Sequence, residues 1–334
     1  MGFAMAIVAP KGRKHLSADA LFRLVRSGFA NIADDGPDDV DISLTETDVL
    51  MSALAMFSLQ SPSLLAFEQQ RAEGNVHTIY GIERVLCDTY RRERLDMVSP
   101  KSLRPVCTYL FRQLQCGQAL EERMFLDGYY LLARAGTGYF SSTTMHCASC
   151  WQRVHRNGAI TSYHQMLGAA LIHPDVRTVI PWMPEPIGKQ DGTDKNDGER
   201  NAAKRFIVKL RQDHPYLQCI STEDSLSTNA PHIETLHNHA LHSILGVKEG
   251  DHAFLFQQVQ GAEDAGRVTS YERHDRAARV VHRLRFVHDV PLHASNVDVW
   301  VNHHGGIAPP GRDTAACNKA TGHTHQKSPC KRPP

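Results

Sequence analysis

The spacing of apolar residues divides the chain into regions of different texture. Over residues 45–125 apolar positions recur at intervals of three and four, which is typical of one face of a helix. Thr45 with Asp48 three residues later is a capping pair that predicts the start of a helix, and the Ser61-Pro62 step predicts its end. We therefore expect a small helical domain over residues 45–125.

From about residue 126 the pattern changes to short apolar runs separated by turn residues. Strands are predicted over residues 129–135, 160–172, 177–183, 217–222 and 253–259, and helices over 200–211 and 229–241. The stretch 184–198 is rich in Pro, Gly and Asp and is expected to be a loop. Strands alternating with helices predict an α/β sheet with helices on its faces.

Two segments are expected to lack packed structure. Residues 1–44 include the acidic stretch Asp34–Asp41, which combines like charges with turn residues and is interpreted as a linker. In residues 303–334 the only large apolar side chain is Ile307, so this segment is predicted to be a disordered tail. Its composition favours translation out of the original frame, although a genuine polar tail has a similar composition.

Composition and charge limit the classes of function. Hydrophobic residues make up 41% of the 334 residues and charged residues 22%, which predicts a chain that is mostly globular. The formal net charge is only +1, so a nucleic-acid-binding protein of this kind must gather its basic residues locally. The candidates for contacts with DNA phosphates form two groups: Arg84, Arg91, Arg92, Arg94, Lys101 and Arg104 in the helical region, and Lys195, Arg200, Lys204 and Arg205 in the α/β region. Interleaved acidic residues leave open that these side chains form only a solvated charged face.

The chain shows no signal peptide and no apolar run near the roughly 18 residues of a membrane span, which favours the cytoplasm. The eight cysteines are not evenly spaced, and thiols stay reduced in that compartment. Cys147-x-x-Cys150, with His146, His155 and His164 nearby, is a candidate zinc site. A single cysteine pair is a weak signal, so reduced structural thiols are the preferred interpretation and zinc is not expected.

Asp224 is the strongest single candidate for chemistry. It directly follows the predicted strand 217–222 and precedes the predicted helix start at Asn229 and Pro231. The carboxyl ends of strands are where α/β sheets place reactive groups. The alternative is an aspartate that caps a turn or helix, and position alone leaves both interpretations open.

Several strings of residues resemble one group of bacterial insertion-sequence transposases, over about residues 45–302. They are Gly136–Ser142, Cys147-x-x-Cys150, Tyr163–Ala169, Pro184–Ile187, Lys189–Gly192, Lys195–Asp197, Glu199–Arg205, Glu223-Asp224, Asn229–Ile233 and Leu245–His252. The resemblance implies a ribonuclease H-like mixed-sheet core over 126–302 behind a helical DNA-binding domain. It also implies two Asp and one Glu that hold two Mg²⁺ or Mn²⁺ ions about 4 Å apart for in-line phosphoryl transfer.

The sequence departs from this acid set at two positions. Asp224 matches the second acid, but Ala135 stands where the first acid is expected, directly before Gly136. Asp127 is no substitute, because a strand over 128–135 places it about 25 Å away at ~3.3 Å per residue. The third acid has no counterpart, since Glu249, Glu263 and Glu272 lie too early and lack its motif.

The expected function is therefore DNA transposition by family resemblance, in a truncated or frameshifted copy that is predicted to be catalytically defective. Duplex DNA is the expected partner, and a homo-oligomer is compatible with the resemblance. One alternative is a catalytically dead DNA-binding remnant. The other is an unrelated metal-dependent hydrolase or nuclease that uses Asp191, Asp197 and Asp224.

Overall fold

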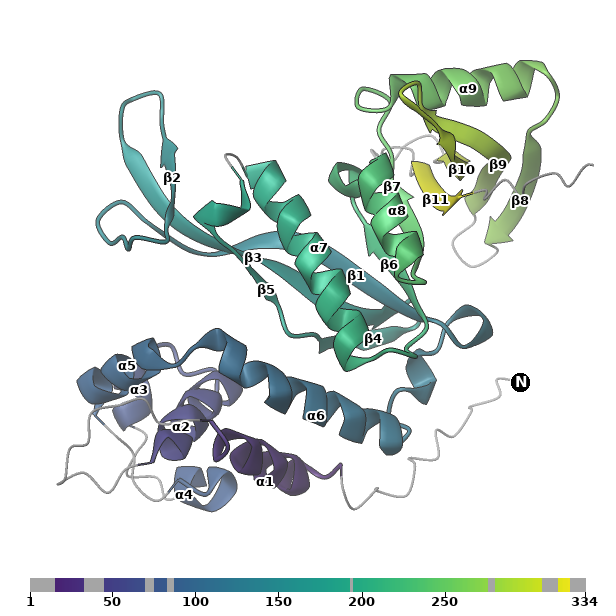
Figure 1. Ribbon diagram of the computed structural model, residues 1–334. Helices are drawn as coiled ribbons and strands as arrows, with labels where there is room; N and C mark the ends of the chain where they lie inside the picture. Colours follow the sequence, from purple (N-terminus) through teal and green to yellow (C-terminus); the bar gives the residue numbers. More distant parts are fainter. Residues whose placement is uncertain are drawn as a thin grey trace, which may run out of the picture. The chain divides into compact units, whose positions relative to one another are not determined.

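The computed structural model describes residues 16–32, 45–69, 75–82, 87–192, 195–275, 280–307 and 318–324. The chain divides into two compact units, Met1–Glu122 and Arg123–Pro334 (Figure 1). In the described residues, no helix combines the length and the apolar character that crossing a membrane requires.

The described elements of the first unit are helical, as the apolar spacing predicted. They are α1 (Ala18–Phe29), α2 (Glu46–Ser58), α3 (Leu64–Gln69), α4 (Asn75–Tyr80), α5 (Asp88–Met97), the 3₁₀ turn η2 (Pro100–Leu103) and α6 (Arg104–Cys116), with η3 (Glu121–Arg123) at the boundary. Met51, Phe67 and Ile82 form the centre of its core, and Phe22 of α1 packs against them.

Helix α2 begins where the capping pair predicted, and it is buried on more than one side. The Thr45 hydroxyl accepts a hydrogen bond from the backbone N–H of Asp48 at 3.3 Å. Phe57 is 75% exposed, whereas Met51 and Ala55 are fully buried. The reason is that α2 contacts α1, α4 and α5, so helices cover more than one of its sides.

The expectation of a poorly ordered segment over 1–44 is wrong for its middle part, because α1 lies there. Ser17 caps this helix by accepting a hydrogen bond from the N–H of Ala20 at 3.2 Å. Phe22, Val25 and Phe29 recur at helical spacing and pack against the core, which stabilises the helix. The acidic stretch Asp34–Asp41 lies outside the described residues.

The second unit is a mixed sheet with helices. Its strands are β1 (Tyr130–Ser142), β2 (Trp151–Val154), β3 (Ile160–His173), β4 (Val176–Pro181), β5 (Glu185–Ile187), β6 (Cys219–Glu223), β7 (His242–Gly246), β8 (Thr269–Asp275), β9 (Val280–His293), β10 (Asn296–Ile307) and β11 (Asn318–Thr324). Its helices are α7 (Lys195–Asp213), α8 (Ala230–Asn238) and α9 (Ala253–Asp264), with 3₁₀ turns η4 (Leu126–Gly128), η5 (Lys189–Asp191) and η6 (Ser225–Ser227). The predicted loop 184–198 therefore contains β5, η5 and the start of α7.

The strand order confirms the predicted fold class. The described strands follow the order β2-β3-β1-β6-β7-β11-β10-β9-β8, with β4 and β5 paired to β3. β1 is antiparallel to β3 and parallel to β6, and β6 is parallel to β7. Two antiparallel strands therefore lie beside three parallel ones, with α7 and α8 as crossovers, which is a mixed-sheet core with helices as predicted (Figure 1).

The register of β1 and β6 fixes the edge where the candidate acids lie. Ala133 pairs with Thr222 in parallel, so Ala135 stands level with Asp224, two residues further along each chain. Both positions therefore lie at the same end of the sheet. β1 runs on to Ser142 rather than ending at Ala135, because its second half pairs with β3.

The predicted strand over 253–259 is wrong, since this stretch begins helix α9. Leu255 and Ala262 are buried, and Phe256 and Val259 pack against the same core. These positions follow the spacing of one helix face. A short apolar run does not distinguish a strand from a buried helix, and here the helical pattern continues into Ala262.

The segment expected to be a disordered tail contains two stretches of strand. His303–Ile307 complete β10, and β11 (Asn318–Thr324) pairs with β10 on one side and with β7 on the other. Strand pairing requires only backbone N–H and C=O groups, so a polar sequence joins a sheet without an apolar core of its own. Residues 308–317 and 325–334 lie outside the described part of the chain.

Candidate functional site

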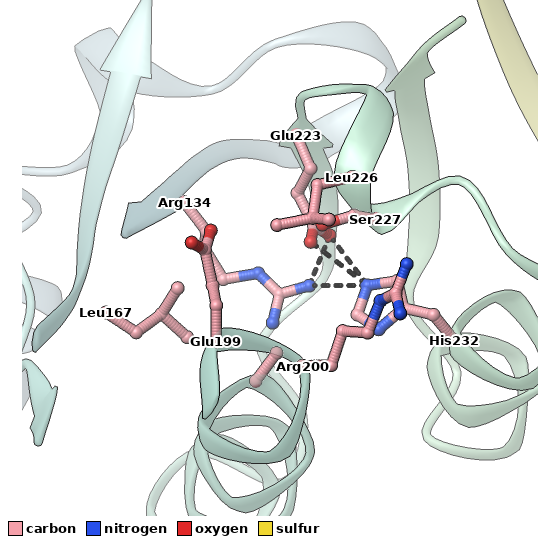
Figure 2. A pocket seen from close by; sticks show the side chains of 9 residues that line it. Arg134, Leu167, Glu199, Arg200, Glu223, Leu226, Ser227 and His232 are labelled. Atoms are coloured by element: carbon pink, nitrogen blue, oxygen red, sulfur yellow. Dashed lines mark hydrogen bonds and ion pairs between the residues drawn. The ribbon is translucent and has the colours of Figure 1, made fainter. Parts of the chain in front are cut away.

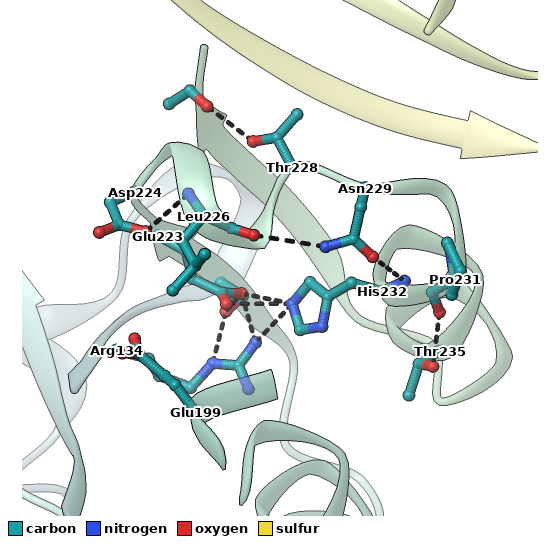
Figure 3. Close-up of polar contacts among 12 residues, drawn as sticks. Arg134, Glu199, Glu223, Asp224, Leu226, Thr228, Asn229, Pro231, His232 and Thr235 are labelled. Atoms are coloured by element: carbon teal, nitrogen blue, oxygen red, sulfur yellow. Dashed lines mark hydrogen bonds and ion pairs between the residues drawn. The ribbon is translucent and has the colours of Figure 1, made fainter. Parts of the chain in front are cut away.

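A buried ionic network occupies the edge where β1 and β6 lie side by side (Figure 3). The Arg134 guanidinium of β1 forms an ion pair with the Glu223 carboxylate at the end of β6, and its Nε donates to Ser221 Oγ at 3.0 Å. His232 of α8 places Nε2 at 3.0 Å from the same carboxylate. The side chains of Arg134, Glu223 and His232 are each no more than 5% exposed, so the charges balance one another away from water.

The electrostatics of this network keep Glu223 ionised. Burial by itself raises the pKa of a carboxyl group, but the positive charge of Arg134 and the hydrogen bond with His232 hold the pKa of Glu223 well below its usual range. A carboxylate neutralised in this way by an arginine is a poor ligand for a divalent cation, because the cation would have to displace the arginine.

Glu199 of α7 reaches the same edge from the helix side (Figure 2). Its Oε1 accepts a hydrogen bond from the backbone N–H of Gly136 at 3.0 Å. A Cβ atom on Gly136 would overlap this carboxylate, so a larger residue at this position would displace the Glu199 side chain. The space between Glu199, Arg134 and Glu223 is about 10 Å³, room for roughly one water molecule and far too little for a nucleotide.

Asp224 lies at this edge but is engaged as a cap. It is exposed, and its Oδ1 accepts a hydrogen bond from the backbone N–H of Leu226 at 3.0 Å, at the start of η6. Its neighbour across the strands, Ala135, supplies no carboxylate. The described residues here do not fit the two divalent ions implied by the resemblance.

Two of the basic residues predicted to contact DNA are buried in the first unit. The Arg91 side chain is inaccessible to solvent, with its guanidinium over the ring of Phe67 at 4.9 Å. Arg94 is 5% exposed and donates to Glu46 Oε2 at 2.8 Å. Burial lowers the pKa of Arg91, because the charged form loses its water. The prediction of DNA contact is therefore wrong for Arg91 and Arg94, since neither reaches the surface.

A third predicted DNA contact, Arg205, takes part in an ion-pair cluster in which the acidic partners are buried and the basic side chains are about one third exposed. It pairs with Asp191 and donates from Nε to Glu185 Oε1 at 2.8 Å, and Lys209 binds the same Glu185 at 2.6 Å. Because Asp191 is already paired with Arg205, this cluster also argues against the alternative metal site of Asp191, Asp197 and Asp224. Asp191 is 5% exposed, and these three aspartates are not among the groups of described residues close enough to share an ion.

The other basic residues predicted to contact DNA differ in how exposed their side chains are. Arg92, Lys101, Arg200 and Lys204 are exposed, and Arg104 is half-buried. Arg92 forms a surface ion pair with Asp88 at 3.1 Å. Arg84 and the side chain of Lys195 lie outside the described residues. Arg200 and Lys204 stand one turn apart on α7, and both are exposed.

A second cluster of donor atoms lies where β1, β2 and β3 meet. Cys147 Sγ and Cys150 Sγ are 3.4 Å apart, and each lies 3.2 Å from His164 Nε2. These three are the described group of His, Cys, Asp and Glu side chains close enough to hold one metal ion. Hydrogen bonding with Cys150 holds the pKa of the Cys147 thiol below its usual range.

Sequence reasoning found part of each cluster. It singled out Asp224 but missed its neighbour Glu223 and the partners Arg134, Glu199 and His232, because nothing in the spacing along the chain indicates which charges meet across the sheet. It named Cys147 and Cys150 but set His164 beside His146 and His155 without choosing between them. His155 instead bonds to Thr161 Oγ1 at 2.8 Å.

Comparisons with known proteins give no match by sequence and a distant likeness by structure. No family model matches the chain, and no curated protein matches it. Among solved structures, the chain is similar to a piggyBac transposase in a synaptic complex with hairpin DNA, with a TM-score of 0.36 and 10% sequence identity. The match covers 93% of this chain and 62% of that chain, so this chain spans less than two thirds of the transposase's length. A likeness at this level carries no argument about activity.

Proposed function

We propose that the chain is a transposase-derived protein that binds duplex DNA but neither cleaves nor joins it on its own. The observation that carries this proposal is the set of side chains found where β6 ends beside β1. There Ala135 replaces the first expected acid, Asp224 caps η6, and Glu223 is neutralised by Arg134. The motif resemblance supplies the ancestry, and we place the protein in the cytoplasm, where it meets DNA.

The missing activity follows from the chemistry that two-metal catalysis requires. Two hard cations need several carboxylate oxygens on a rigid frame to clamp the attacking and leaving oxygens of the phosphate. In the described residues, the edge offers one exposed carboxylate, that of Asp224. Each 1.36 kcal/mol of lost transition-state stabilisation costs about tenfold in rate, so losing two of three acids brings the reaction to background.

The proposed DNA contact on the second unit is the exposed side of α7 with Arg200 and Lys204. Arg200 lies 4.0 Å from Asp197 and both side chains are nearly half exposed, so this weak pair leaves the guanidinium accessible to a phosphate. Lys204, one helical turn further, is exposed. Residues four apart lie on one helix face, so both cations present themselves to the same partner.

The catalytic half of the proposal is tested by nicking of supercoiled DNA with Mg²⁺ or Mn²⁺. We expect background rates for the chain as it stands and for Ala135→Asp, because one restored acid does not complete the set. The matched control is Asp224→Ala in the same preparation. Metal-dependent nicking that Asp224→Ala abolishes would overturn the proposal.

The binding half is tested by titrating duplex DNA at several salt concentrations. Each phosphate contact contributes about −0.9 to the slope of log affinity against log salt, so Arg200→Gln and Lys204→Gln should each make the slope shallower by about one. Arg283→Gln removes an exposed arginine of the same unit that already pairs with Glu272 and serves as the control. Equal slopes for all three variants would exclude α7 from the interface.

A further inference from the structure

We propose that Cys147, Cys150 and His164 bind one zinc ion, with the fourth coordination position open to solvent. The three donor atoms converge on one point, at separations of 3.4, 3.2 and 3.2 Å. Zinc bonds of about 2.3 Å to sulfur and 2.0 Å to nitrogen in tetrahedral geometry place sulfurs about 3.8 Å apart and sulfur and nitrogen about 3.5 Å apart. The observed separations are within a few tenths of an ångström of these values.

The sheet register explains why the third ligand is His164. Trp151 of β2 pairs with Tyr163 of β3 in antiparallel fashion, so the next position back, Cys150, stands opposite His164. On the other side of β3, Phe140 of β1 pairs with His164 directly. The imidazole is thus placed on the central strand, beside the start of β2.

The turn that carries the cysteines is shaped to present both thiols together. The backbone N–H of Cys150 donates to the carbonyl of Cys147 at 3.2 Å, and the N–H of Cys147 lies 3.2 Å from Cys150 Sγ. Lys189 holds the turn from outside by donating to the carbonyl of Ala148 at 3.1 Å. Trp151, directly after Cys150, is buried and donates to the carbonyl of Ile187.

Aromatic packing orients the imidazole. The Tyr139 ring stacks on the His164 ring with centroids 5.8 Å apart and an interplanar angle of 14°, and the Phe140 ring lies at 5.8 Å in a tilted arrangement. Cys147 is exposed, Cys150 is buried and His164 is half-buried, so an ion bound here keeps one side toward water. Two thiolates and one imidazole suit zinc better than Mg²⁺ or Ca²⁺, which prefer oxygen ligands.

The test uses the full chain, stripped of metal under reducing conditions and titrated with Co²⁺ as the probe. We expect one equivalent to bind, with the thiolate-to-cobalt absorption and the strong visible bands of a tetrahedral site, and Zn²⁺ to displace it. Cys147→Ser, Cys150→Ser and His164→Gln should each weaken binding by more than about 100-fold, which exceeds the loss usual for residues that only support a ligand. His155→Gln and Cys116→Ser are matched controls and should bind Co²⁺ as the parent does.

Three results would overturn the proposal. The first is failure of the reduced parent chain to bind Co²⁺ in a one-to-one ratio. The second is binding that persists undiminished in Cys150→Ser, which would place the metal elsewhere. The third concerns the open position: if His146→Gln weakens binding as much as the ligand variants do, the fourth site is filled by that histidine. Far-ultraviolet circular dichroism of each variant separates a lost ligand from a lost fold.

Discussion

The two polar clusters of the second unit each contain three titratable side chains, but they differ in whether the charges are neutralised within the cluster. At the strand edge, Arg134, Glu223 and His232 satisfy one another's charge inside the protein. Where β1, β2 and β3 meet, Cys147, Cys150 and His164 bring three electron-pair donors together with no arginine or lysine among them. The first arrangement needs no ion, whereas the second is the cluster at which we propose that zinc binds. Charge balance within a cluster thus says more about its chemistry than the number of candidate ligands.

The largest effect that tests this contrast is the removal of Arg134. Arg134→Ala leaves the Glu223 carboxylate buried without its cation, and breaking a buried ion pair from one side costs about 3–5 kcal/mol of unfolding free energy. Urea unfolding measures the loss. Arg283→Ala removes an exposed pair with Glu272 and should cost at most about 1 kcal/mol. Equal losses in the two variants would mean that the strand-edge network is not a closed structural unit.

The next effect concerns the cluster of Cys147, Cys150 and His164. A ligand that binds only the folded state stabilises it by about 2.7 kcal/mol at 100 times its dissociation constant. Zinc should therefore raise the Tm of the second unit, and chelator should reverse the rise. Cys150→Ser should abolish the response, whereas Arg134→Ala should retain it at a lower Tm. If zinc leaves the Tm of the parent chain unchanged, neither cluster binds the metal and the proposed difference between them is wrong.

The buried His303 side chain predicts how the stability of the second unit depends on pH, in a range where Glu223 does not titrate. His303 Nε2 is buried and has no hydrogen-bond partner among the described residues, and burial lowers the pKa of His303 to about 4. Since this value lies below the usual 6.5, the unfolded state binds the extra proton first. Stability is then fully present above pH 6.5 and falls as the pH drops toward 4, by about 1–3 kcal/mol.

Urea unfolding between pH 7.5 and 5 measures this loss, and His303→Leu should make the profile flatter. Glu223 should not contribute in that window. Its lowered pKa means that its stabilisation is complete above the usual carboxyl pKa and is lost only in stronger acid. A His303→Leu variant with the parent's pH profile would contradict the assignment.

The smallest expected effect is that of Asp224→Ala. If Asp224 acts as the cap of η6, its removal costs about 0.5–1 kcal/mol, because a hydrogen bond to the N–H of Leu226 is lost. Asp224→Asn keeps an acceptor oxygen and should restore most of the loss. Differential scanning calorimetry of the three proteins measures it. A gain in stability on removing the carboxylate would indicate instead that repulsion with a neighbouring acid dominates.

The sequence by itself determined much of the element order, although α1, β5, α9 and β11 were not predicted. The capping pair at Thr45 predicted the start of α2, and the alternation of apolar runs with amphipathic stretches predicted the helical first unit and the mixed sheet of the second. Local hydrogen bonds and periodic burial decide these features, so they can be read along the chain. The same logic failed at residues 253–259, where a short apolar run fits a strand and a helix equally.

The tertiary structure alone decided which side chains meet. Arg91 and Arg94 look like surface cations in the sequence, and only the packing of α5 shows them buried against Phe67 and Glu46. His164 became the partner of Cys147 and Cys150 through the register of β2 on β3. Burial and cross-strand contact depend on residues far apart in the chain. The sequence therefore fixes which chemical groups are available, and the fold decides whether a charge is exposed, neutralised or free to bind an ion.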